Sequence, residues 1–219
     1  MKKNIKCLCG SNLSIEYKEE IDLDAEPSIV DSILNGTFMS YDCNFCKKKH
    51  KPEFKIILIW KSKNIKIEVF PELDRSEFYS AKKEKSSKET VSFETVSSET
   101  VSLETVIGFP EMTDRIAVIK DSLEPVVIET LKSYILARAE ENYPDNEINV
   151  WYHNKGPAGI EFHLDGIRTG EVAVMRVPQE AYDKTMNDYK KNPKSGIFPS
   201  LRVRSYLSIH NILRPAALK

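Results

Sequence analysis

The sequence lacks the segments and the charge that would direct a protein to a membrane or to nucleic acid. Its longest apolar run is Ile56–Trp60, which is far too short to span a bilayer. No apolar signal-peptide core follows the basic N-terminal residues, so we expect a cytoplasmic protein. The formal net charge is −1, which gives no overall field to attract nucleic acid or an anionic membrane.

Recognisable catalytic motifs are also missing. The sequence contains no phosphate-binding glycine loop, no zinc-protease motif and no nucleophile elbow. His163 and Asp165 lie near the end of an expected strand and could form an imidazole–carboxylate pair. No nucleophile accompanies them, and His153 is distant in sequence, so we interpret these histidines as structural. We therefore expect a protein that is not an enzyme.

Cysteine is scarce, and its positions carry the clearest signal in the sequence. The chain has four cysteines in two short pairs, Cys7 with Cys9 and Cys43 with Cys46. A tetrahedral zinc ion needs four soft donors from two tight turns, and these pairs supply them. Because cytoplasmic thiols stay reduced, the pattern predicts a structural zinc (Zn²⁺) site in which all four cysteines are ligands.

The surroundings of the two pairs bear on this prediction. Only one residue separates the first pair, and His50 follows the second pair as an alternative ligand. Gly10 suits a turn that requires a positive φ, and Phe45 would shield the metal from water on one side. Free thiols, a disulfide between the two loops and a redox-active C-x-x-C are the competing interpretations.

Apolar periodicity predicts a small zinc-ribbon-like β domain over residues 1–75. It predicts strands over three ranges, 12–23, 54–60 and 65–70. Apolar residues at helical spacing predict a short helix over 28–34, which ends where Asn35-Gly36 can stop it.

Residues 76–103 differ in composition from the rest of the chain. A Lys-, Ser- and Glu-rich stretch leads into a five-residue repeat that starts at Glu89. A period of five fits neither a strand nor a helix, so the range is predicted to be a low-complexity linker. The alternative is that its threonine- and valine-rich units pair as extended chain.

Residues 104–219 are predicted to form an α+β domain with an antiparallel sheet, which makes the whole chain α+β. The clearest helix is expected over 126–141, with Pro125 in its first turn. Strands and a second helix follow, over 148–153, 160–164 and 170–177 for the strands and 178–189 for the helix. The periodicity does not decide between strand and helix around Ile116 or over 201–213.

Several short stretches together match the pattern of one protein family. They are Ile5-Lys6-Cys7, Glu26-Pro27-Ser28, Ile33 to Phe38, Cys43 to Cys46, Val69-Phe70-Pro71, Glu129 to Lys132, and Val177-Pro178 with Tyr182. In these stretches the chain resembles the CpXC-domain proteins, a bacterial group named for two Cys-Pro-x-Cys-type motifs. Here neither cysteine pair contains the proline, and the first pair is one residue short. The resemblance implies a metal-binding architecture, a cytoplasmic bacterial origin and no assigned activity.

Charge around the second cysteine pair suggests two kinds of partner. Lysines run through 47–51, and Trp60 could stack on a base, as in zinc ribbons that bind nucleic acid. Acidic residues between Glu16 and Glu26 balance these lysines. We therefore expect a binding or adaptor module that displays a surface to a protein partner. A nucleic-acid-binding ribbon is the alternative, and a thiol-redox protein is the third interpretation.

Overall fold

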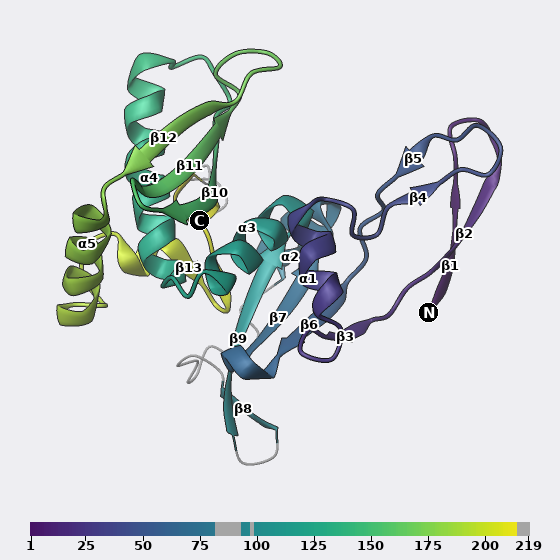
Figure 1. Ribbon diagram of the computed structural model, residues 1–219, viewed down its shortest axis with the longest axis horizontal. Helices are drawn as coiled ribbons and strands as arrows, with labels where there is room; N and C mark the ends of the chain where they lie inside the picture. Colours follow the sequence, from purple (N-terminus) through teal and green to yellow (C-terminus); the bar gives the residue numbers. More distant parts are fainter. Residues whose placement is uncertain (82–92, 97–98, 214–219) are drawn as a thin grey trace. The chain divides into compact units, whose positions relative to one another are not determined.

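A computed structural model describes residues 1–81, 93–96 and 99–213 of the chain (Figure 1). The chain divides into two compact units, Met1–Thr113 and Asp114–Lys219. Helices alternate with several mainly antiparallel sheets, so the predicted α+β class is confirmed. The boundary between the units lies inside helix α3 (Phe109–Lys120), later in the chain than the expected domain boundary at 104.

The N-terminal unit contains two small hairpins (Figure 1). Strands β1 (Lys2–Lys6) and β2 (Asn12–Glu16) pair antiparallel, and so do β4 (Tyr41–Asp42) and β5 (Lys49–His50). Each hairpin turn carries one cysteine pair. Hairpins this small are marginally stable alone, so their position depends on what joins their turns.

A larger sheet forms the core of the N-terminal unit, with β3, β6, β7 and β9 as successive neighbours. Its strands are β3 (Glu20–Asp22), β6 (Ile56–Trp60), β7 (Ile65–Phe70) and β9 (Glu99–Ile107). The β6–β7 pair is antiparallel, whereas β3–β6 and β7–β9 are parallel. Strand β7 matches the strand predicted over 65–70, and every second side chain along it, Ile65, Ile67 and Val69, is buried.

Short helices complete this unit. Helix α1 (Pro27–Leu34) has Pro27 in its first turn and buries Val30 and Ile33, as its sequence predicts. A 3₁₀ turn (Lys61–Lys63) joins β6 to β7, and a second one (Glu72–Asp74) leads into α2 (Arg75–Ser80).

The structure departs from the expected linker over 76–103. Helix α2 extends to Ser80, strand β8 (Phe93–Val96) pairs antiparallel with β9, and β9 pairs along β7 from Ser102 to Ile107. Residues 82–92 and 97–98 lie outside the described part of the chain. The repeat period does not match a strand, but β-branched threonine and valine favour extended chain once a neighbouring strand supplies hydrogen bonds.

The C-terminal unit places one long helix against a three-stranded antiparallel sheet (Figure 1). The sheet consists of β10 (Asn149–Gly156), β11 (Gly159–Asp165) and β12 (Ala173–Val177). Helix α4 (Pro125–Asn142) packs its apolar residues on one face of the sheet, where Val150, Phe162 and Leu164 are buried. Helix α5 (Gln179–Lys191) follows, as predicted.

Periodicity left two regions undecided between strand and helix; the first is helical, and the second contains both kinds of element. Ile116 belongs to helix α3. The residue directly before this helix, Gly108, has a left-handed backbone conformation with φ +82°. Residues 198–213 hold four short elements in succession: a 3₁₀ turn (Phe198–Leu201), β13 (Arg202–Val203), β14 (Tyr206–Leu207) and α6 (His210–Leu213). Within the described residues, no helix is both long and apolar enough to cross a bilayer.

Candidate metal centre

The two hairpin turns that carry the cysteine pairs are closed by backbone hydrogen bonds. In the β1–β2 turn, the N–H of Gly10 donates to the Cys7 carbonyl at 2.9 Å, and Gly10 has φ +88°, as its position predicts. In the β4–β5 turn, the N–H of Lys47 donates to the Cys43 carbonyl at 2.9 Å. Lys47 is itself left-handed, with φ 59°. Both turns therefore hold their cysteines in fixed, closely spaced positions.

The sulfurs of all four predicted ligands converge between the two turns. Cys7 Sγ lies 3.5 Å from Cys46 Sγ, and Cys9 Sγ lies 3.8 Å from Cys43 Sγ. All four sulfurs lie within 4.8 Å of one another, and each cysteine is a free thiol. A tetrahedral ion with metal–sulfur bonds of about 2.3 Å would place its sulfurs about 3.8 Å apart. The donor set and its spacing therefore fit a metal ion.

Two neighbouring side chains contact the sulfurs without joining the group of four. Ser11 Oγ lies 3.1 Å from both Cys9 Sγ and Cys43 Sγ. His50 Nε2 lies 3.2 Å from Cys7 Sγ. Sequence reasoning considered His50 as a replacement ligand and missed Ser11, although a hydroxyl two residues after a cysteine is in reach of its sulfur.

The thiols differ in acidity. Hydrogen bonds from the backbone N–H of Cys46, the Ser11 hydroxyl and the backbone N–H of Phe45 lower the pKa of Cys43 to about 5. The Ser11 hydroxyl and backbone lower the pKa of Cys9. At Cys7 the backbone N–H of Cys9 favours the thiolate, but burial and the neighbouring thiols outweigh it and raise the pKa to about 12. Four adjacent thiolates need a cation to offset their mutual repulsion, and a divalent ion would supply that charge.

The chain matches a protein family and a curated relative. A family model described as CpXC protein matches residues 5–132. The chain belongs to the CpXC family. A curated relative from Treponema pallidum (strain Nichols), called an uncharacterized protein, is 28% identical over 218 residues, which cover 97% of this chain and 99% of the relative. No solved structure gives a significant match.

The first cysteine pair of this CpXC protein is shorter than the motif that gives the family its name. Its single intervening residue, Leu8, does not prevent convergence, because both sulfurs still reach those of the other turn. The side chain of Leu8 is 84% exposed, and that of Phe45 in the second turn is 82% exposed. The expectation that Phe45 shields the metal is wrong, because the ring is open to solvent.

Charged and aromatic residues near the centre lie differently from the sequence interpretation. Lys47, Lys48, Lys49 and Lys51 are all exposed, and the Lys51 ammonium donates to the Gly36 carbonyl. Trp60 is only 9% exposed, so it cannot stack on a base as expected. The exposed aromatic beside the lysines is instead Phe45.

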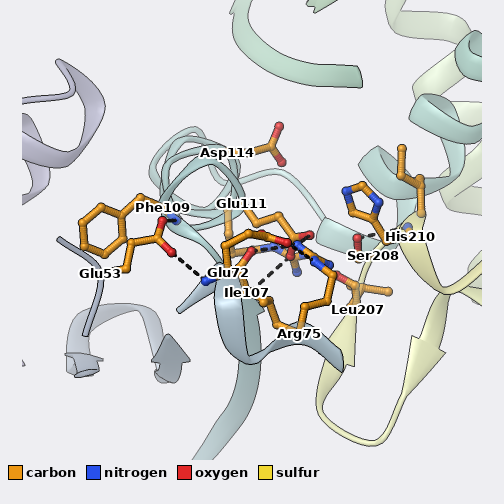
Figure 2. Close-up of polar contacts among 12 residues, drawn as sticks. Glu53, Glu72, Arg75, Ile107, Phe109, Glu111, Asp114, Leu207, Ser208 and His210 are labelled. Atoms are coloured by element: carbon orange, nitrogen blue, oxygen red, sulfur yellow. Dashed lines mark hydrogen bonds and ion pairs between the residues drawn. The ribbon is translucent and has the colours of Figure 1, made fainter. Parts of the chain in front are cut away.

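A polar cluster fixes the start of α3 in the CpXC chain (Figure 2). Glu53 accepts hydrogen bonds from the backbone N–H of Phe109 at 2.7 Å and of Glu72 at 2.6 Å. Arg75 donates to Glu111 at 2.9 Å and to the Ile107 carbonyl at 3.1 Å. These contacts tie the ends of β7 and β9 to α3, and they give the cluster a structural role.

The C-terminal unit buries a network of charges that sequence reasoning missed. Lys132 Nζ donates to Asp114 at 2.9 Å and to Glu129 at 2.8 Å. The remaining carboxylate oxygens accept backbone N–H groups, from Tyr152 for Asp114 at 2.6 Å and from Ile209 for Glu129 at 2.8 Å. The three-residue spacing of Glu129 and Lys132 on α4 was the available signal. Every charge has a partner, which favours a structural role.

The histidines of this unit do not form the imidazole–carboxylate pair that His163 and Asp165 could have made. Asp165 is bound instead to the indole N–H of Trp151 at 2.8 Å and to the Asn149 amide at 2.8 Å. His163 contacts Glu161 instead, with Nε2 3.1 Å from Oε1.

Proposed function

We propose that this CpXC protein binds zinc through Cys7, Cys9, Cys43 and Cys46, and that the zinc is structural. The observation that carries the proposal is the convergence of four sulfurs at the separations that a tetrahedral ion requires. Four soft thiolates favour zinc among common divalent ions, although such a set also suits iron–sulfur chemistry. Four protein ligands fill a tetrahedral zinc and leave no position for substrate, which favours structure over catalysis.

Elemental analysis and native mass spectrometry of protein purified without chelator test the zinc. We expect Cys43→Ser to contain one zinc per chain fewer than the wild type. Iron with a sulfide-dependent mass would identify a cluster instead. A metal-free chain with a disulfide between the turns would contradict the proposal and favour the thiol-redox interpretation.

We further propose that the two cysteine-bearing turns, held together by the metal, form a docking surface for a protein partner. Leu8 and Phe45 are large apolar side chains, one in each cysteine turn, and both are almost fully exposed. Holding such residues in rigid turns lowers the conformational entropy lost on binding. The metal would therefore act by presenting these side chains to a complementary apolar pocket.

Variants of these two residues test the docking surface. Zinc-loaded wild-type protein would be used to capture partners in extracts of the source organism, with quantitative mass spectrometry. A specific partner should be lost with the Leu8→Ser/Phe45→Ser variant. Leu73→Ser is the matched control, because Leu73 is 93% exposed and lies outside both turns. A partner set that is unchanged by the double variant would contradict the docking surface.

Nucleic-acid binding is the second candidate function, and one observation favours it. The exposed Phe45 ring lies next to exposed Lys47, Lys48 and Lys49, a combination that suits stacking on a base and contact with phosphates. Fluorescence anisotropy with single-stranded oligonucleotides should then show salt-dependent binding. Alanine at the three lysines should abolish it, whereas alanine at the exposed Lys190, Lys191 and Lys194 should not.

A further inference from the structure

The outer face of the C-terminal sheet carries a second group of metal-ligating side chains. His153 lies on β10, and Glu161 and His163 lie on β11. His163 Nε2 lies 3.1 Å from Glu161 Oε1, and His153 Nε2 lies 4.0 Å from the same oxygen. One ligand atom from each residue falls within 4.8 Å of the other two. Two imidazole nitrogens therefore face a single carboxylate oxygen.

A β-bulge creates this convergence. The register between β10 and β11 shifts between Tyr152 and Asn154, so His153 is the extra residue of its strand. The extra residue has no direct partner across the ladder, and its ring stacks on that of His163 with centroids 3.8 Å apart. Bulges often re-aim a side chain at functional positions in sheets.

Neighbouring side chains prepare Glu161 as a ligand. Arg176 on β12 donates from Nε and Nη2 to Glu161 Oε2, both at 2.9 Å. This fixes the carboxylate and leaves Oε1 directed at the two imidazoles. Asp165 takes no part, because its own oxygens are bound to Trp151 and Asn149. A ligand held by an outer partner is the usual arrangement in metal sites.

We propose that His153, Glu161 and His163 form a binding site for a divalent transition metal ion, such as Zn²⁺. Imidazole and carboxylate donors suit such ions, and bonds of about 2.1 Å in tetrahedral geometry place ligand atoms about 3.4 Å apart. The separations of 3.1 and 4.0 Å bracket that value. The site is independent of the four cysteines, because all of its ligands lie in the C-terminal unit.

Metal binding requires one rearrangement, which the structure allows. The two rings are nearly parallel, at 16°, so both lone pairs cannot point at one ion until a ring turns about χ2. The side chain of His153 is 49% exposed and can turn without disturbing the core. Three protein ligands leave a coordination position for water or another small ligand, unlike a four-thiolate site.

Cobalt titration of the full-length chain tests the proposal, because Co²⁺ reports its ligands by absorption. Thiolate ligands give intense charge-transfer bands, whereas imidazole and carboxylate ligands give only weaker ligand-field bands. We expect one equivalent with the thiolate bands and a second equivalent without them. Isothermal titration calorimetry with Zn²⁺ should likewise show two binding sites.

Variants assign the second equivalent. His163→Gln, Glu161→Gln and His153→Ala should each weaken it more than about 100-fold, since even the loss of an outer partner costs about 10- to 100-fold. His210→Gln is the matched control and should retain both equivalents. Because the His153 side chain is 49% exposed, we expect His153→Ala to stay folded, and circular dichroism of this variant distinguishes loss of the site from unfolding. A wild-type chain whose bound cobalt gives thiolate bands only, or variants that keep the equivalent without thiolate bands, would overturn the proposal.

Discussion

His50 Nε2 lies 3.2 Å from Cys7 Sγ, although the two residues are 43 positions apart in the chain. His50 ends β5, and Cys7 follows β1, so the contact joins the two hairpins beside the sulfur cluster. Because His50 contacts the sulfur of Cys7 and lies outside the group of four sulfurs, we expect it to support Cys7 by a hydrogen bond and not to bind the metal itself.

His50→Ala is expected to weaken zinc binding about 10- to 100-fold, the usual cost of losing an outer partner. Cys9→Ser removes a ligand and should have a much larger effect. Competition with a chromophoric chelator measures both. Equal losses in the two variants would instead make His50 a ligand, and unchanged affinity in His50→Ala would show that the contact gives no support.

Removal of the metal should release the two hairpins and leave the larger sheet folded. Zinc binding in small modules supplies on the order of 10 kcal/mol, whereas β6 and β7 are each held by strands on both sides. Hydrogen–deuterium exchange of Cys43→Ser should therefore rise over residues 1–16 and 40–52 and stay slow over 56–70. Adding chelator to this variant should change nothing more. Equal protection of the hairpins with and without metal would contradict the prediction.

The buried charges of the C-terminal unit give a stability prediction. Lys132→Met leaves Asp114 and Glu129 without their shared cation in a dry environment. Breaking a buried pair in this way costs about 3–5 kcal/mol. Urea unfolding of the full-length chain measures the loss in the free energy of unfolding. Lys190→Met, at an exposed position of α5, is the control. A change of the same small size in both variants would show that the network contributes little.

The same network gives an acid dependence. Burial opposes the ionisation of Glu129, but Lys132 and Arg115 outweigh it and lower the pKa of this carboxyl. A lowered pKa in the folded state gives its full stabilisation above the unfolded pKa of about 4.3, and this stabilisation is lost as the pH falls from there through the lower pKa of the folded state. The melting temperature of the wild type should therefore exceed that of Glu129→Gln at pH 7, and the difference should shrink as the pH is lowered toward about 3. A difference that is constant with pH would contradict this assignment.

Local pattern in the sequence was enough for much of the N-terminal unit and for the four cysteines of the candidate metal centre. Both cysteine pairs, the proline-initiated helix α1 and the alternating strand β7 are fixed by spacing within short segments. The chemistry of four soft donors in two turns likewise needs no long-range information. The same holds for α4, whose apolar residues recur at helical spacing.

Tertiary structure alone decided which distant residues meet. The repeat-bearing strand β9 exists because β7 offers it a parallel partner, which no local period can show. A register shift of one residue brings His153 over His163, and the paired charges of Asp114 and Lys132 come from different helices. Strand pairing, bulges and ion pairs depend on contacts between segments far apart in the chain, whereas periodicity records only which side of one segment is buried.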